Sequence, residues 1–343
     1  MEKKVTIYTL AEELHMTPSM VSRGLSLDGK VSKENREKIL KAAEKYNYTA
    51  NKHASRLSMK TLKIGVLIHS NFKVHVSEML RGIEAAYEEL KDYKIAYDVT
   101  VVYGDEKEKW ECAEELNQYV DYDGVLICGF SSRKCIPMLK EFSEKNPNIV
   151  QFQSINNHID YLFGSRHNEA LASEMAAEFL SDCLRYKDSK NVLLFTGNKE
   201  SSVHSGARKA FLKAADTYGL HVLECVDMQD SSRVLRECLP AIFEKYHHNI
   251  DGIYITSGVS IELCKFVEHY DCCLVTFDIY DELAPYIEKR VVTASVFQDV
   301  FKQSKNAFEK FVRYSIDGER IDKEIYTNVT LITKSNLHIY ARL

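Results

Sequence analysis

Apolar residues recur at helical spacing in three short segments before residue 48, and each segment has its own start signal. Thr6 can cap the first helix, Thr17 followed by Pro18 can open the second, and Ser32 can open the third. A hydroxyl side chain satisfies a free N–H at a helix start, and a proline in the first turn has no N–H to leave unpaired. We therefore expect three short helices around one small shared core.

The pattern changes from Lys63 onward, where short apolar runs alternate with stretches of helical period. The expected strands are 64–68, 95–102, 124–128, 149–152, 192–195, 222–226, 252–255 and 274–277. The expected helices are 78–90, 110–120, 169–183, 207–218, 234–246, 261–270 and 301–316. This alternation predicts an α/β fold of parallel sheets with helices on both faces. The series divides near residue 162, so we expect two such sheets.

Charge is distributed unevenly along the 343 residues. The whole chain has 45 Lys and Arg against 50 Asp and Glu, a net charge of -5. Residues 1–62 hold 12 basic and 7 acidic side chains, which leaves 33 basic and 43 acidic side chains in the rest. A basic module joined to an acidic body indicates contact with nucleic acid.

The chain has no signal for a membrane or a secretory route. No stretch approaches the roughly 18 apolar residues that a membrane span needs, and the first residues lack the apolar core of a secretion signal. Most of the nine Cys lie in apolar runs and none forms C-x-x-C, which favours reduced, buried thiols over metal or redox chemistry. We expect a cytoplasmic protein with no membrane partner, no metal and no cofactor.

The segment from Thr6 to Leu27 has the spacing of a helix-turn-helix, in which the second helix enters the major groove of DNA. Pro18, Ser19 and Arg23 would then face the base edges, and Arg23 can donate two hydrogen bonds to a guanine. The alternative is a small structural bundle with a solvated basic face. The local surplus of positive charge favours DNA.

Five parts of residues 1–48, Ala42-Ala43 among them, closely resemble the headpiece of the lactose/galactose-repressor (LacI/GalR) family. They are 5–8, 21–23, 31–40, 42–43 and 46–48, and 64–67 matches the start of that family's core. Asn51, Ala54 and Leu57 match its hinge-helix pattern, where pattern alone would indicate only a solvated linker. The resemblance implies a homodimeric transcription regulator with a two-lobed periplasmic-binding-protein-like core.

The resemblance also assigns DNA contacts. Leu57, with Ala54 beside it, would be the apolar wedge that opens a base step in the minor groove. The positions that resemble contacts to the DNA backbone are Thr6, Tyr8, Thr17, Ser22, Asn51 and Lys52. Gly24 departs from the family, which usually has a larger apolar residue there, and it lowers helix propensity by about 1 kcal/mol.

An effector site is expected at the carboxyl ends of the strands, between the two sheets. Asp278 follows a strand and can accept two hydroxyl hydrogen bonds, which suits a sugar or a polyol. The other candidates, placed by the resemblance and by their strand-end or loop positions, are Gln298, Gln153, Ser154, Ser257, His75 and Arg208. Arg208 stands one place later than the family's ligand-binding arginine, and Ala207 occupies that arginine's position. His167 replaces a usual aspartate, so a standard hexose pocket does not follow.

The resulting prediction is a DNA-binding repressor whose affinity for a pseudo-palindromic operator is changed by a bound effector. The expected boundaries are 1–50 for the headpiece, 51–62 for the hinge, 63–162 with 293–322 for the N-terminal lobe, and 163–292 with 323–343 for the C-terminal lobe. Two alternatives are a non-regulatory small-molecule-binding protein and an α/β enzyme with an accessory helical domain. The sequence contains no G-x-S-x-G, H-E-x-x-H or strand-linked G-x-G-x-x-G, so we expect no enzyme.

Overall fold

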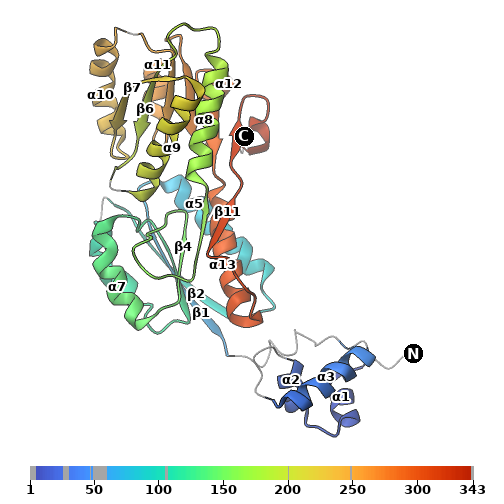
Figure 1. The fold of residues 1–343 in the computed structure, drawn as a ribbon. Helices are drawn as coiled ribbons and strands as arrows, with labels where there is room; N and C mark the ends of the chain where they lie inside the picture. The colour runs from blue at the N-terminus through green and yellow to red at the C-terminus, as the bar shows by residue number, and fades with distance from the viewer. Residues whose placement is uncertain are drawn as a thin grey trace. The chain divides into compact units, whose positions relative to one another are not determined.

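A computed structural model describes residues 5–25, 31–46, 48, 60–104, 107–199, 201–247 and 249–340. The chain divides into two compact units, one of Met1–Lys60 with Asp92–Lys94 and one of Thr61–Lys91 with Ile95–Leu343 (Figure 1). Residues 51–59 of the predicted hinge lie outside the described part of the chain. None of the described helices has the length and apolar character that crossing a membrane requires.

The smaller unit contains the three expected helices, α1 (Ile7–Glu13), α2 (Pro18–Leu25) and α3 (Lys33–Lys45). Their starts agree with the cap residues, since Thr6 Oγ1 accepts from the N–H of Thr9 and Ser32 Oγ accepts from that of Asn35. The buried hydrophobic cluster of this unit consists of Leu10, Ala11, Val21, Ile39, Ala42 and Ala43. Gly24 lies in this core, and a Cβ at that position would collide with the side chain of Ile39. Close packing of α2 on α3 therefore explains the glycine.

The first sheet of the larger unit is entirely parallel, in the order β11-β5-β4-β3-β1-β2. Its strands are β1 (Leu62–His69), β2 (Ile95–Val102), β3 (Gly124–Cys128), β4 (Ile149–Phe152), β5 (Phe163–His167) and β11 (Glu324–Thr327). Val125 and Ile127 pack on the side of α6 (Ala113–Asn117) and α7 (Ile136–Lys145). Gly124 faces Phe311 of α13 (Val300–Asp317), which packs against α5 (Lys73–Glu89). Helices thus cover both faces.

The second sheet has the order β12-β10-β9-β8-β6-β7, and only β12 runs antiparallel to its neighbour. Its strands are β6 (Asn191–Thr196), β7 (His221–Asp227), β8 (Gly252–Ile255), β9 (Cys273–Phe277), β10 (Ala294–Phe297) and β12 (Thr330–Ile332). On one face lie α8 (Glu169–Cys183) and α9 (Ser202–Tyr218), and on the other α10 (Ser232–Lys245), α11 (Ile261–Val267), α12 (Ala284–Glu288) and α14 (Leu337–Tyr340). Alternate residues of β6 enter the two cores, as a sheet buried on both faces requires.

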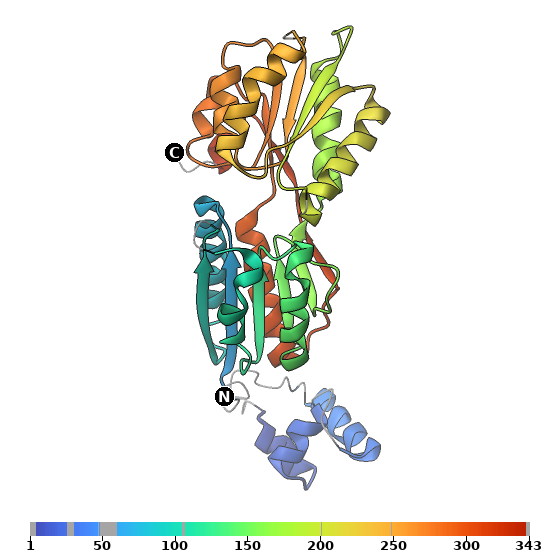
Figure 2. The ribbon, with the colours of Figure 1, turned by 90° about the vertical axis from the view of Figure 1, so that its left-hand side faces the viewer.

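The two sheets define two lobes, and the chain crosses between them three times (Figure 2). The crossings follow β5, β10 and β11. The two-lobed α/β core is therefore as expected, but its internal boundaries differ from 162/163, 293–322 and 323–343. β5 and β11 pair with each other in the first sheet, and β10 pairs with β9 in the second. Neither β5 nor β11 is an apolar run, so only their pairing across the sheet reveals them.

A candidate ligand-binding cleft

A cleft of about 1000 Å³ lies between the two lobes. Loops at the carboxyl ends of the parallel strands line it, as expected for open α/β sheets. Six of the seven predicted effector residues lie in its lining, namely His75, Gln153, Ser154, Ser257, Asp278 and Gln298. Their part in ligand binding remains a prediction.

Asp278 is the central acidic group of this cleft. It follows β9 and is only 2% exposed, and its φ of 66° is a left-handed conformation that is rare outside glycine. Its Oδ2 accepts a hydrogen bond of 2.8 Å from Nε2 of Gln298 and lies 2.7 Å from Nε2 of His75. Its Oδ1 is buried and has no hydrogen-bond partner within the described residues. His75 belongs to α5 of the first lobe, so the pair links the two lobes.

Gln298 is held by the chain segments that cross between the lobes. Its backbone oxygen accepts hydrogen bonds from Nε2 of Gln303 at 2.7 Å and from Oγ1 of Thr327 at 3.1 Å. The amide oxygen of Gln298 also accepts from Nε2 of Gln303 at 3.3 Å, which orients the amide group that donates to Asp278. Gln303 and Thr327 are buried and were not predicted from the sequence.

Two predicted serines also stabilise loop backbone. Oγ of Ser154 accepts from the N–H of Gly129 at 2.9 Å, and Oγ of Ser257 accepts from the N–H of Val259 at 3.2 Å. Gln153, between β4 and Ser154, has a φ of 62°. A serine hydroxyl that accepts from the backbone still has its own proton to donate, and the hydroxyl of Ser257 is hydrogen-bonded to Asp230 in this way.

Three residues that the sequence did not single out as ligand contacts also line the cleft. His167 ends β5, its Nδ1 has no hydrogen-bond partner in the described part of the chain, and burial lowers its pKa, so the ring is neutral. His204 of α9 lies 3.3 Å from Asp230 Oδ2 through its Nε2. Burial raises the pKa of Asp230, but the hydrogen bonds and charge of His204 and the amide of Asn198 outweigh this and hold it far below its ordinary value. His204 and Asp230 lie 26 positions apart, so only folding brings them together.

Arg208 lies outside the cleft, which corrects its prediction as an effector contact. Ala207 lines the cleft, whereas Arg208 is exposed and interacts with the thiol of Cys225. Successive helical residues are about 100° apart around the axis, so one position turns the guanidinium away from the site.

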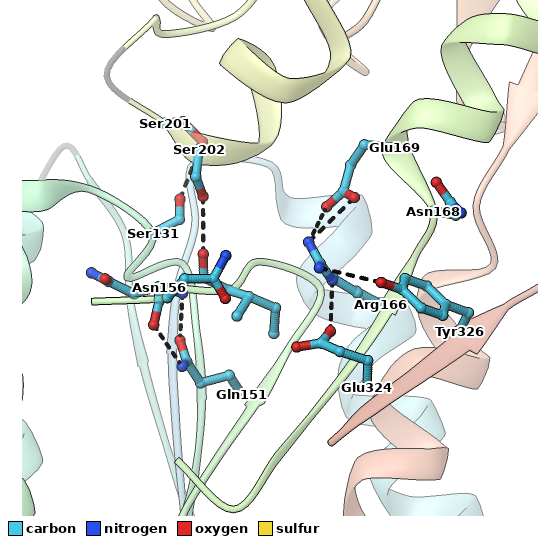
Figure 3. Close-up of polar contacts among 12 residues, drawn as sticks. Ser131, Gln151, Asn156, Arg166, Asn168, Glu169, Ser201, Ser202, Glu324 and Tyr326 are labelled. Atoms are coloured by element: carbon cyan, nitrogen blue, oxygen red, sulfur yellow. Dashed lines mark hydrogen bonds and ion pairs between the residues drawn. The ribbon is translucent and has the colours of Figure 1, made fainter. Parts of the chain in front are cut away.

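Hydroxyl groups connect the two lobes at one edge of the cleft (Figure 3). Oγ of Ser131 in the first lobe lies 3.1 Å from Oγ of Ser201 in the second. Oγ of Ser202 donates a hydrogen bond of 2.9 Å to the carbonyl of Ile155. These short polar side chains lie in loops and at a helix start, and no sequence pattern distinguishes them from ordinary capping residues.

Arg166 forms a second polar cluster where the chain leaves β5 (Figure 3). Its Nε donates to Glu324 Oε2 at 2.8 Å and its Nη1 to Glu169 Oε1 at 3.1 Å. Its Nη2 donates to the hydroxyl of Tyr326 at 3.4 Å. Glu169 opens α8 of the second lobe and Glu324 begins β11 of the first, so Arg166 connects both lobes at a crossing.

The predicted DNA contacts in the smaller unit have local roles where the structure describes them. Thr6 and Thr17 accept from the N–H groups of Thr9 and Met20, as helix caps. Arg23 is exposed and its Nε donates to the carbonyl of Ser19. The other described positions are Tyr8 and Ser22, both exposed, and Pro18, which is half-buried. Asn51, Lys52, Ala54 and Leu57 lie outside the described residues.

The periplasmic binding protein domain model matches residues 64–319 of this chain, and the chain belongs to that family. By this description the family consists of binding proteins rather than enzymes. A search of curated proteins found no match.

Solved structures of the same fold include GanP, a glucose-galactose binding protein from Geobacillus stearothermophilus, at 18% identity and a TM-score of 0.71, over 82% of this chain and 100% of that one. A solute binding protein of an ABC transporter from Burkholderia graminis, in complex with D-arabinose, has 18% identity and a TM-score of 0.72, over 83% and 100%. A putative LacI transcriptional regulator from Bacteroides fragilis has 15% identity and a TM-score of 0.69, over 82% and 100%.

These comparisons contradict the prediction of a DNA-binding repressor with an operator as partner. The family match starts at residue 64, and most of the similar structures are named as sugar-binding proteins. The alternative of a non-regulatory small-molecule-binding protein fits them better. The same names count against a cytoplasmic location and the absence of a membrane partner, since several are periplasmic or transporter components. Three short helices with a surplus of basic residues are equally typical of a structural bundle with a solvated surface. Pattern and charge therefore did not distinguish such a bundle from a DNA-binding module.

Proposed function

We propose that this chain binds a small hydroxylated molecule of the sugar class in the cleft between its lobes. One observation carries the proposal. Two buried polar atoms, Oδ1 of Asp278 and Nδ1 of His167, lack hydrogen-bond partners within the described residues, and both residues line the same cleft. A buried polar group without a partner costs about 1–3 kcal/mol, and a native structure retains such a cost where another group completes the bond.

The two atoms suit ligand hydroxyls. The carboxylate oxygen of Asp278 can only accept when ionised, so it requires a donor such as a hydroxyl. The neutral ring of His167 has one nitrogen that donates and one that accepts, and a hydroxyl can serve either. The sugar-binding proteins among the similar structures support the same class of ligand.

The two groups come from different lobes, and this couples binding to lobe movement. His167 ends β5 of the first sheet, while Asp278 follows β9 of the second. A ligand that bonds to both stabilises the arrangement in which the lobes are close together, relative to one in which they are apart. The three crossings are the segments in which a hinge would move.

The test is calorimetric titration of the full chain with a panel of neutral, amino-substituted and acidic monosaccharides. We expect at least one to bind, and Asp278→Ala to abolish its heat signal. Asp182→Ala is the matched control, because Asp182 is an exposed acid that pairs with Arg185 on the surface. Thermal unfolding provides a second measurement, since a ligand at 100 times its Kd stabilises by about 2.7 kcal/mol. Absence of both heat and stabilisation across the whole panel would overturn the proposal.

A further inference from the structure

The charges that line the cleft indicate the kind of molecule it accepts. We propose that the ligand is a hydroxylated amine, such as an amino sugar, and that its ammonium group binds beside Oδ1 of Asp278. This inference rests on the proposed function and narrows its ligand class.

Acidic side chains outnumber basic ones in the described lining. Six carboxylates line the cleft, namely Glu108, Glu169, Asp227, Asp230, Asp278 and Glu282. The basic residues of the described lining are Lys109, Lys134 and Lys199, with no arginine among them. Five of the six acids belong to the second lobe, so the excess is concentrated on one wall.

The three aspartates of the lining lie deeper than Lys134 and Lys199. Asp278 is 2% exposed, and Asp227 and Asp230 are half-buried. Lys134 and Lys199 are exposed, and the Lys134 ammonium lies over the ring of Trp110, 4.6 Å from its centre. Lysine ammonium groups at the surface are surrounded by solvent, which screens their charge from the deeper carboxylates.

Histidines, rather than lysine or arginine, lie beside the carboxylates of Asp278 and Asp230. In the part of the chain that the structure describes, none of the three aspartates forms an ion pair with lysine or arginine. Asp227 accepts from the N–H of Gln229, and Asp230 accepts from the N–H of Asn198. Their other partners are the neutral side chains of Gln298 and Ser257 and the histidines His75 and His204, which are charged only when protonated. Glu169, by contrast, is bonded to Arg166.

A bound ammonium group would complete this arrangement. It would donate to the unpartnered Oδ1 of Asp278 and would also supply the positive charge that a buried carboxylate needs. A neutral sugar satisfies the hydrogen bond and leaves the charge uncompensated. A phosphorylated or uronic sugar adds a like charge to a carboxylate-lined wall, which is repulsive. The cleft volume of about 1000 Å³ is sufficient for a small ligand of any of these kinds.

The test compares ligands that differ in one group, by calorimetric titration of the full chain. D-glucosamine is compared with D-glucose, D-galactosamine with D-galactose, and D-glucuronate and D-glucose 6-phosphate provide the acidic members. We expect the amine of a pair to bind at least about tenfold more tightly than its neutral partner. We expect each acidic sugar to bind at least about tenfold more weakly than the neutral one.

Substitutions of single aspartates test which carboxylates cause the preference for an amine over a neutral sugar. Asp278→Asn retains the size and an acceptor oxygen but removes the charge, so the ratio of amine to neutral affinity should fall to about one. Asp227→Asn is a second variant that lowers the same ratio and keeps the test valid if Asp278→Asn does not fold. Asp182→Asn is the control and leaves the ratio unchanged. Added salt should weaken binding of the amine more than binding of the neutral sugar.

The outcomes separate the two proposals. Equal or tighter binding of a neutral or acidic sugar overturns the amine inference and leaves the proposed function standing. Tight binding of an amine that Asp278→Asn and Asp227→Asn leave unchanged overturns the assigned position of the ammonium group. Absence of binding by every sugar in the panel overturns the proposed function, and the inference with it.

Discussion

Replacement of Arg166 by alanine is expected to destabilise the larger unit by about 2–4 kcal/mol. The guanidinium bonds to Glu169 and Glu324, and the side chains of the three residues are only 19%, 12% and 22% exposed. Removal of one member of a fully buried ion pair costs about 3–5 kcal/mol, while a surface pair contributes about 0–1 kcal/mol. The exposed fractions of these three side chains are closer to those of a buried ion pair than to those of a surface pair. In addition, the Arg166→Ala substitution removes the partner of two carboxylates at once.

Urea unfolding followed by tryptophan fluorescence measures this loss. The chain has a single tryptophan, Trp110, which lies in the larger unit, so its signal reports that unit alone. Arg185→Ala is the control, because Arg185 and Asp182 form a pair that is 64% exposed on each side and should change stability by less than about 0.5 kcal/mol. If Arg166→Ala were no more destabilising than Arg185→Ala, the argument from burial would be refuted.

Three further predictions concern packing, pH and thiol reactivity. Gly82→Ala in α5 should destabilise the protein by about 1–3 kcal/mol in the same urea assay, because a Cβ there would collide with the backbone of α13. Gly206→Ala in α9 is the control, since a Cβ there meets nothing within 4 Å. This control should be neutral or should stabilise the protein by up to about 1 kcal/mol. Burial lowers the pKa of His167 from 6.5, so the unfolded chain binds the extra proton first and stability falls as pH drops below that value. The fall is at most about 1.4 kcal/mol per pH unit for one group, and a pH slope of urea unfolding that His167→Gln leaves unchanged would contradict it. The neighbouring thiol of Cys273 lowers the pKa of exposed Cys183 to about 7, so iodoacetamide followed by mass spectrometry should find Cys183 modified before any buried cysteine; equal labelling would refute this.

Strands that are largely apolar could be predicted from the sequence, including the edge strands β2 and β7, whereas the polar strands β5 and β11 at the lobe crossings could not. β3 is buried at all five positions, and its residues are correspondingly apolar. β5 contains Gly164, Ser165 and Arg166, and β11 starts with Glu324. Arg166 and Glu324 bond to each other in the cluster at the lobe crossing, so the interactions that place these strands come from distant parts of the chain.

The residues of the cleft likewise divide into those that a local sequence pattern predicts and those that only the folded chain brings together. Asp278 and Gln153 follow strands that the sequence predicted, and the rule for strand ends places them at the cleft without further information. The pairing of His204 with Asp230 depends on how the start of α9 meets the loop after β7, which no local pattern records. The prediction that Arg208 contacts the effector was wrong for a local reason, because a shift of one residue along a helix places a side chain on a different face of that helix.

Two residues of the cleft have strained backbone conformations. Gln153 and Asp278 adopt φ values of 62° and 66°, and each such conformation costs about 1–3 kcal/mol outside glycine. Both residues line the cleft, where Asp278 also has an unpartnered buried oxygen. A glycine would relieve the strain, and an asparagine would relieve the charge, without loss of the turn. The residues present at these two positions are therefore unfavourable for folding alone, which accords with the ligand-binding role that we propose for the cleft.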